Sequence, residues 1–296
     1  MKRLLMTIAF IALTLTALKA EENTNVYNFG DITRIQASMV YEVHVTEGTS
    51  GRVTIVFESD YQKHIGVKYN EKKSELSLQL NDIPNKFKRG NQPAIKVYLE
   101  MDRIDAITLM GAGTVIFDGD FSGGNDLQIS MSGTAKIYGL RADGKDLNIN
   151  SSGACKTEVS GNFSKSVEIE HSGASKGEYN LNARELCCEM SGAAKASIQG
   201  QFDDSAEIQV SGACNLEMEG STEHFQFEAS GASYIAAKDF IAKNVRGVLS
   251  GASQADIHAV RSIVYDSSRT TKINIYGSPS VKLTTDHPFS SEIVIP

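Results

Sequence analysis

The stretch SGACKTEVSG, residues 152–161, contains a triplet that returns along the chain at nearly constant intervals. Ser-Gly-Ala starts at residues 152, 172, 191, 211, 230 and 250, and Ser-Gly-Thr starts at 132. Successive glycines of the series are 20, 20, 19, 20, 19 and 20 residues apart, and MGAG at 110–113 is a degenerate eighth member. A fixed period of about 20 residues is typical of repeat proteins, in which each unit buries its apolar face against its neighbours.

Residues around each triplet alternate between apolar and polar. Positions two residues after the glycine are small, and those four and six residues before it are mostly apolar, whereas odd offsets are mostly polar. This period of two predicts strands with one buried face, and helical solenoids are excluded because no 3.6-residue period is found. We therefore predict an all-β fold, a parallel β-helix (solenoid) with about 20 residues per coil, roughly three short sides per coil and roughly eight coils.

The glycines are predicted to be structural corners, because glycine adopts positive φ without a steric penalty. Seven positions share this prediction: Gly133, Gly153, Gly173, Gly192, Gly212, Gly231 and Gly251. The serine before each glycine is predicted to face outward, where its hydroxyl can bond the backbone of a neighbouring coil.

The remaining segments divide the chain into regions. Residues 1–20 have the basic start, apolar middle and small final residue of a secretory signal peptide, with a membrane anchor as the alternative. Residues 21–28 form a polar leader. Residues 29–109 read as an irregular β-rich part of the same domain, which either caps the solenoid or forms its first coils. Residues 110–280 carry the β-helix, and residues 281–296 close it.

Three parts of the sequence resemble the bacterial "putative auto-transporter adhesin, head GIN domain" family. They are the recurring Ser-Gly-Ala, the opening VYEVHVTEG at 40–48 followed by VTIVFESD at 53–60, and INIYGSPSVK at 273–282. The likeness covers about residues 28 to 285. It implies a β-helix-like fold, export in a Bacteroidetes-type bacterium and a role in adhesion, and it transfers no catalytic residue to this chain.

The most regular charged feature is a column of lysines three residues after successive glycines: Lys136, Lys156, Lys176 and Lys195. Two interpretations remain open. The column is a solvated charge ladder, offset by Glu158, Glu178 and Glu217 two residues further on, or it is a ligand-binding line that grips a carboxylated polymer along the rod axis.

Other chemistry is sparse in the sequence. The acidic balance, 29 basic against 36 acidic residues, argues against a nucleic-acid partner. The histidines lack metal-ligand spacing, so we expect no metal and no cofactor, and His171 should point inward as a hydrogen-bonded core residue. The adjacent acids at 118 and 120, and at 203 and 204, do not form the facing carboxylate pair of a glycosidase.

The cysteines, Cys155, Cys187, Cys188 and Cys214, are expected to be free, because the column puts Cys155 and Cys214 three coils apart.

Two functions follow. The first is an exported, non-catalytic β-helix protein of the periplasm, the cell surface or the medium, an adhesin or scaffold that binds a glycan or a cell-surface protein. The alternative is a carbohydrate-active enzyme, a polysaccharide lyase or hydrolase, built on the same rod. No second long apolar run follows the signal, so we expect no membrane-spanning segment in the mature chain.

Overall fold

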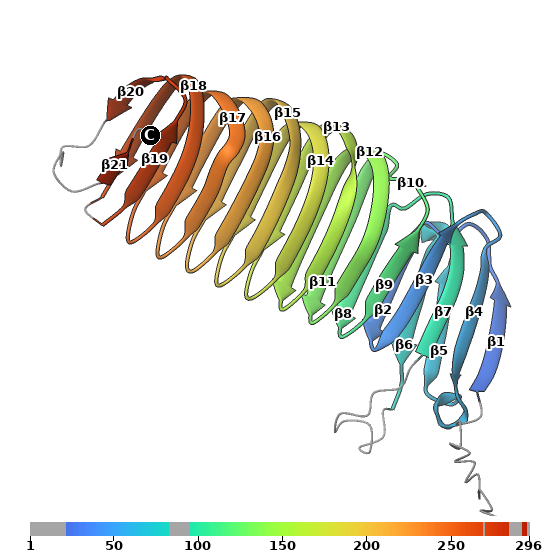
Figure 1. Cartoon of the computed structure of the whole chain (residues 1–296). Coiled ribbons are helices and arrows are strands. Elements are labelled where there is room, and N and C mark those ends of the chain that lie inside the picture. Colours follow the sequence, from blue (N-terminus) through green and yellow to red (C-terminus); the bar gives the residue numbers. More distant parts are fainter. Residues whose placement is uncertain (1–21, 83–94, 269, 284–291, 295–296) are drawn as a thin grey trace, which may run out of the picture.

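The protein is described by a computed structural model that covers residues 22–296, except 83–94, 269, 284–291 and 295–296. The expected signal peptide therefore lies outside the described residues. The described chain forms a rod of stacked coils with a smaller β-sandwich at its N-terminal end (Figure 1). About nine turns of roughly 20 residues make up this β-solenoid, which confirms the predicted fold class.

The body of the rod is built from strands that pair in parallel with the equivalent strand of the next coil. They are β8 (Ala106–Gly111), β9 (Thr114–Asp118), β10 (Phe121–Ser122), β11 (Asp126–Gly133), β12 (Lys136–Gly153), β13 (Lys156–His171), β14 (Lys176–Met190), β15 (Lys195–Val210), β16 (Asn215–Ala229), β17 (Tyr234–Leu249) and β18 (Gln254–Ser267). Their registers place residues with the same offset from the glycine opposite one another. Each offset thus becomes a column of side chains parallel to the rod axis.

Each coil has a pointed corner at one edge of the rod and a broad arch at the other (Figure 1). The Ser-Gly-Ala triplet forms the corner, where the seven repeat glycines have φ between +69° and +94°. At Gly153 an added Cβ would lie 2.5 Å from the carbonyl oxygen of Gly133 in the preceding coil. That carbonyl also accepts a 2.7 Å hydrogen bond from the backbone N–H of Ala154. A side chain at the glycine would therefore displace the bond that joins adjacent corners.

The arch of β13 joins the two sides of its coil. The chain remains extended through it, so β13 is one strand of 16 residues, and only a register shift between Asn162 and Ser166 marks the bend. In β13 two sides of the coil are therefore joined by an unbroken strand, whereas the coil before β12 is divided into the three strands β9, β10 and β11. Glycine gives the arch its close backbone approach: a Cβ at Gly200 would lie 1.7 Å from the carbonyl oxygen of Leu181.

The N-terminal region contains both a first coil of the solenoid and a cap, the two alternatives that the sequence left open. Strands β2 (Arg34–Met39) and β3 (Tyr41–Glu47) pair in parallel with β8 and β9 and so form a first coil. The cap comprises β1 (Glu22–Asn28), β4 (Arg52–Glu58), β5 (Ile65–Asn70), β6 (Glu75–Leu80), β7 (Ile95–Met101) and the short 3-10 helices Ser59–Tyr61 and Glu71–Lys73. Antiparallel pairs β1–β4, β4–β7 and β5–β6 extend the two sides of that coil into a sandwich.

The C-terminal end is closed by three short strands. They are β19 (Lys272–Tyr276), β20 (Ser280–Leu283) and β21 (Glu292–Val294). β19 and β20 pair with the two sides of β18, and β21 pairs with β19.

A single apolar core runs through the interior from the cap to β19. The columns four and six residues before each glycine are buried, and aromatic rings fill the later coils, where the Phe225 and Phe240 rings meet edge to face at 5.4 Å. Gly247 lies opposite Phe227, and a Cβ there would be 2.2 Å from the Phe227 ring. Large and small residues on neighbouring coils therefore complement each other in volume.

Candidate functional site

The four predicted lysines occupy one outward column on consecutive coils. Lys136 pairs with Lys156, Lys156 with Lys176, and Lys176 with Lys195, in the registers of β12 to β15. Neighbouring Cα atoms in such a ladder are about 4.8 Å apart. Lys136, Lys176 and Lys195 are exposed, and the side chain of Lys156 is 33 % exposed. The structure thus brings together on one face the lysines that the sequence placed at a common offset.

Lys156 is held differently from the other three lysines. Its Nζ lies 2.7 Å from Oε1 of Glu158 on its own strand and 3.5 Å from Oε1 of Glu178 on the next coil. The hydrogen bond to Glu158 is the main cause of a raised Lys156 pKa. The same ammonium lies 5.1 Å from the ring centroid of Tyr138. The predicted compensation of lysine charge by neighbouring glutamates is therefore found at Lys156.

One acid of each adjacent pair is engaged in an ion pair between coils. Oδ1 of Asp120 lies 2.5 Å from Nε of Arg141, and Asp204 pairs with Arg184. Within the part of the chain that the structure describes, no cluster of three or more His, Cys, Asp or Glu side chains is arranged to hold a metal ion.

His171 points into the core, as predicted, and its side chain bridges two hydroxyl groups. Nδ1 lies 2.9 Å from Oγ of Ser175, and Nε2 lies 2.7 Å from the hydroxyl of Tyr179. The residue is 2 % exposed, and burial lowers the His171 pKa to about 4. Gly177 leaves room for this arrangement, because a Cβ there would be 2.3 Å from the Tyr179 ring.

All four cysteines are free, and Cys155, Cys188 and Cys214 are buried, as the column assignment predicts. Cys187 is partly exposed on the outer face, opposite Glu168 and Glu207 of the adjacent coils. Its pKa is raised, first by desolvation and then by neighbouring carboxylates, chiefly Glu207. The raised pKa lowers the fraction of the reactive thiolate.

Alkylation of the native protein at pH 8 should therefore modify Cys187 first and slowly, and the other three thiols only after unfolding. Mass mapping of the labelled peptides over time measures this order. Peptide mapping without reductant is the complementary measurement, and a Cys155–Cys214 bridge in that map would contradict the column assignment.

Comparison with known proteins gives the family. The model of the family "Putative auto-transporter adhesin, head GIN domain" matches residues 31–201 and 164–279, which together span most of the chain. The chain belongs to this family. The fold of this family member is also similar to two solved structures. One is a putative adhesin from Parabacteroides distasonis (10% identity, TM-score 0.52, covering 93% of this chain and 98% of the other), and the second is a putative adhesin from Parabacteroides merdae (13%, 0.52, 93% and 97%).

No curated protein matches the chain in sequence. Among the described residues, no helix is long and apolar enough to cross a membrane.

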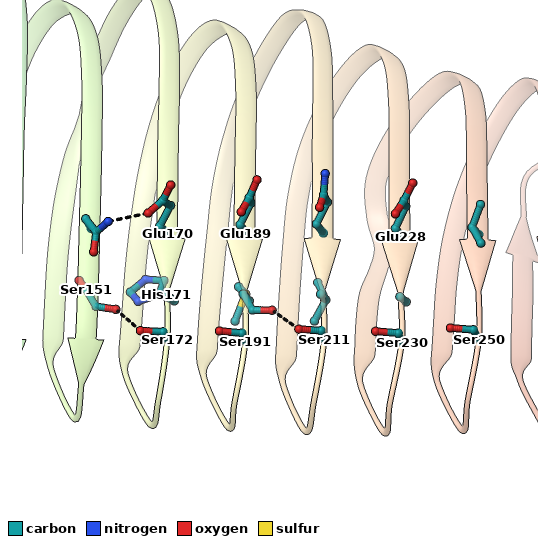
Figure 2. A pocket seen from close by; sticks show the side chains of 16 residues that line it. Ser151, Glu170, His171, Ser172, Glu189, Ser191, Ser211, Glu228, Ser230 and Ser250 are labelled. Atoms are coloured by element: carbon teal, nitrogen blue, oxygen red, sulfur yellow. Dashed lines mark hydrogen bonds between the residues drawn. The ribbon is translucent and has the colours of Figure 1, made fainter.

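A surface groove of this family member beside the corners was not predicted. It has a volume of about 350 Å³ and follows the rod axis beside the corners (Figure 2). Carboxylates of Glu170, Glu189 and Glu228 project along one side of it, and the corner serines form a straight row along the other. The hydroxyl of Ser211 donates to the carbonyl of Met190 at 3.4 Å, as expected for an outward serine that bonds the preceding coil.

A sequence signal for this groove existed. The position three residues before each glycine reads Ser130, Asn150, Glu170, Glu189, Gln209, Glu228 and Val248. Residues with the same offset from the glycine form one column, so this position predicts a second charged column. It has the opposite charge to the lysine column and lies on the side that precedes the corner.

Proposed function

We propose that this protein is an exported, non-catalytic adhesin that binds a carboxylate-bearing glycan lying along the rod over Lys136, Lys156, Lys176 and Lys195. The observation that carries the proposal is the register of β12 to β15, which sets the four lysines in one line at the repeat of the coils. A flexible lysine presents a compact charge with three donors and tolerates variation in the position of a carboxylate. A line of four such groups therefore suits a polymer with repeated carboxylates.

Membership of an adhesin family supports a binding role, and the ion pairs made by Asp120 and Asp204 support the absence of a free carboxylate pair for hydrolysis at those positions. Exposed ion pairs contribute about 0 to 1 kcal/mol each, so useful affinity comes from several lysines acting together. Export is supported by the signal-like residues 1–20.

Replacing all four column lysines by glutamine is expected to weaken binding to a carboxylated polysaccharide about tenfold or more and to reduce the dependence of binding on salt. The measurement is calorimetric or biolayer titration against polygalacturonate, alginate and hyaluronan at two ionic strengths. The length of the polymer should stay unchanged during incubation, as measured by release of reducing ends.

The matched control replaces four exposed lysines outside the column, Lys145, Lys165, Lys238 and Lys243, by glutamine. Both variants change the formal charge by the same amount, so only a positional effect distinguishes them. Equal affinity loss in the two variants would contradict the proposed line, and release of reducing ends that one side-chain change abolishes would favour an enzyme instead.

A further inference from the structure

A second outward column runs beside the lysine column, two residues further along each strand. At the N-terminal end of the rod it consists of Tyr98 on β7, His44 on β3, Ile116 on β9 and Tyr138 on β12. His44 lies directly opposite both Tyr98 and Ile116, and Ile116 lies opposite Tyr138. Four consecutive strands therefore present a ring or a branched apolar side chain outward at the same position. We name this set the aromatic column.

The aromatic column is partly exposed and rigidly held. Tyr98 is 42 % exposed, and its ring stacks on the His44 ring with centroids 5.0 Å apart and an interplanar angle of 16°. Nε2 of His44 lies 2.7 Å from Oε1 of Glu42, which fixes the imidazole. At the other end, the ammonium of Lys156 lies 5.1 Å from the Tyr138 ring centroid. Both tyrosines are therefore at least partly exposed, and their ring contacts exist before any ligand binds.

The apolar character of this position is confined to these strands. On the next two coils the position two residues after the column lysine is Glu158 and Glu178, whose side chains are 31% and 64% exposed. Column neighbours are charged or polar on both sides: Lys96, Glu42, Thr114 and Lys136 on one, and Glu100, Thr46 and Asp118 on the other. The exposed apolar strip is thus one side chain wide and is bordered by charged or polar side chains.

We propose that the aromatic column is a second line of contact for the same glycan, packing against uncharged parts of its sugar rings while the lysine column pairs with its carboxylates. This inference rests on the proposed function. A sugar presents C–H groups and hydroxyls, and a tyrosine offers an apolar body with a hydroxyl at low entropy cost. A narrow apolar strip beside charge fits such an amphipathic chain lying along the axis, whereas an apolar protein surface would need a wider patch.

The test compares the double variant Y98A/Y138A with a control that truncates two exposed apolar residues of β17 and β18, I241A/V260A. The ligands are whichever of polygalacturonate, alginate and hyaluronan binds the wild type most tightly, and the same polymer after chemical reduction of its carboxyl groups to alcohols. Thermal unfolding of each variant verifies that the fold is retained.

The tyrosine variant is expected to bind both the native and the reduced polymer about tenfold more weakly than the control variant does. The lysine variant is expected to lose affinity for the native polymer alone. Unchanged binding by the tyrosine variant, together with a loss in the lysine variant, would overturn the aromatic contact and leave the proposed function standing. If the wild type bound none of the carboxylated polymers, the proposed function would fail, and the aromatic contact with it.

Discussion

Gly153→Ala is expected to lower the free energy of unfolding by about 3 kcal/mol or more, and the melting temperature by roughly 6 °C or more. Two effects add at this corner. The backbone holds φ at +94°, which alanine tolerates poorly. The new Cβ would also lie 2.5 Å from the carbonyl oxygen of Gly133, a backbone atom that moves only if the adjacent coil moves.

The control is Ala154→Ser in the same corner, which likewise adds a single heavy atom but on an exposed side chain. Calorimetry or denaturant titration of both variants measures the difference. Each coil contacts only its neighbours, so the loss should be greatest in the coils around residue 153, where limited proteolysis should cut first. Equal stability of the two variants would show that the corner does not require glycine.

Acidification is expected to cost this protein about 3 kcal/mol of stability through His171 alone, between pH 6.5 and about 4. Burial places the folded-state pKa of His171 near 4, whereas the unfolded chain takes up the proton near the ordinary histidine pKa of 6.5. In this window the unfolded state binds more protons, so stability falls as the pH falls. The contribution is complete above pH 6.5 and is lost by about pH 4.

The appropriate comparison is the double variant H171M/Y179F, which removes the titrating ring together with the Tyr179 hydroxyl, while the hydroxyl of Ser175 still donates to the carbonyl of Ser172 at 3.2 Å. Methionine occupies the equivalent position on the next coil, at Met190, and two coils earlier, at Met131. Replacing both partners of a buried hydrogen bond by apolar groups avoids leaving one unsatisfied. Denaturation at intervals from pH 7 to pH 4 should give a shallower loss for the double variant than for the wild type. Identical slopes of stability against pH in the two proteins would show that His171 does not contribute to the loss of stability in acid.

The repeat body could be predicted from the sequence because one backbone geometry recurs seven times and each recurrence carries the same constraints. The glycine, the serine before it and the small residue two positions after it all follow from a single corner. The same rule placed the lysines at one offset and His171 inward, since period-two alternation decides which face a side chain occupies.

Other features lay beyond the sequence for identifiable reasons. Residues 29–109 lack the triplet, and alternation by itself does not distinguish a parallel coil from the antiparallel strands β4 and β5. Gly161 and Asn162 are residue types typical of turns, but the parallel ladder carries extended chain through the arch at that point. The aromatic column arises from β7, β3, β9 and β12, which are far apart in sequence, so only the pairing registers reveal it.

Identical corners raise a question of specificity for folding. A corner glycine fits the coil below it equally well in every repeat, so the corners alone would permit a coil to stack on the wrong partner, displaced by one whole period. The interior breaks this degeneracy. The Phe227 ring requires a neighbour without a side chain, and Gly247 supplies it; Tyr179 likewise requires Gly177 and finds His171. The contacts of these irregular residues are satisfied in only one stacking order of the coils.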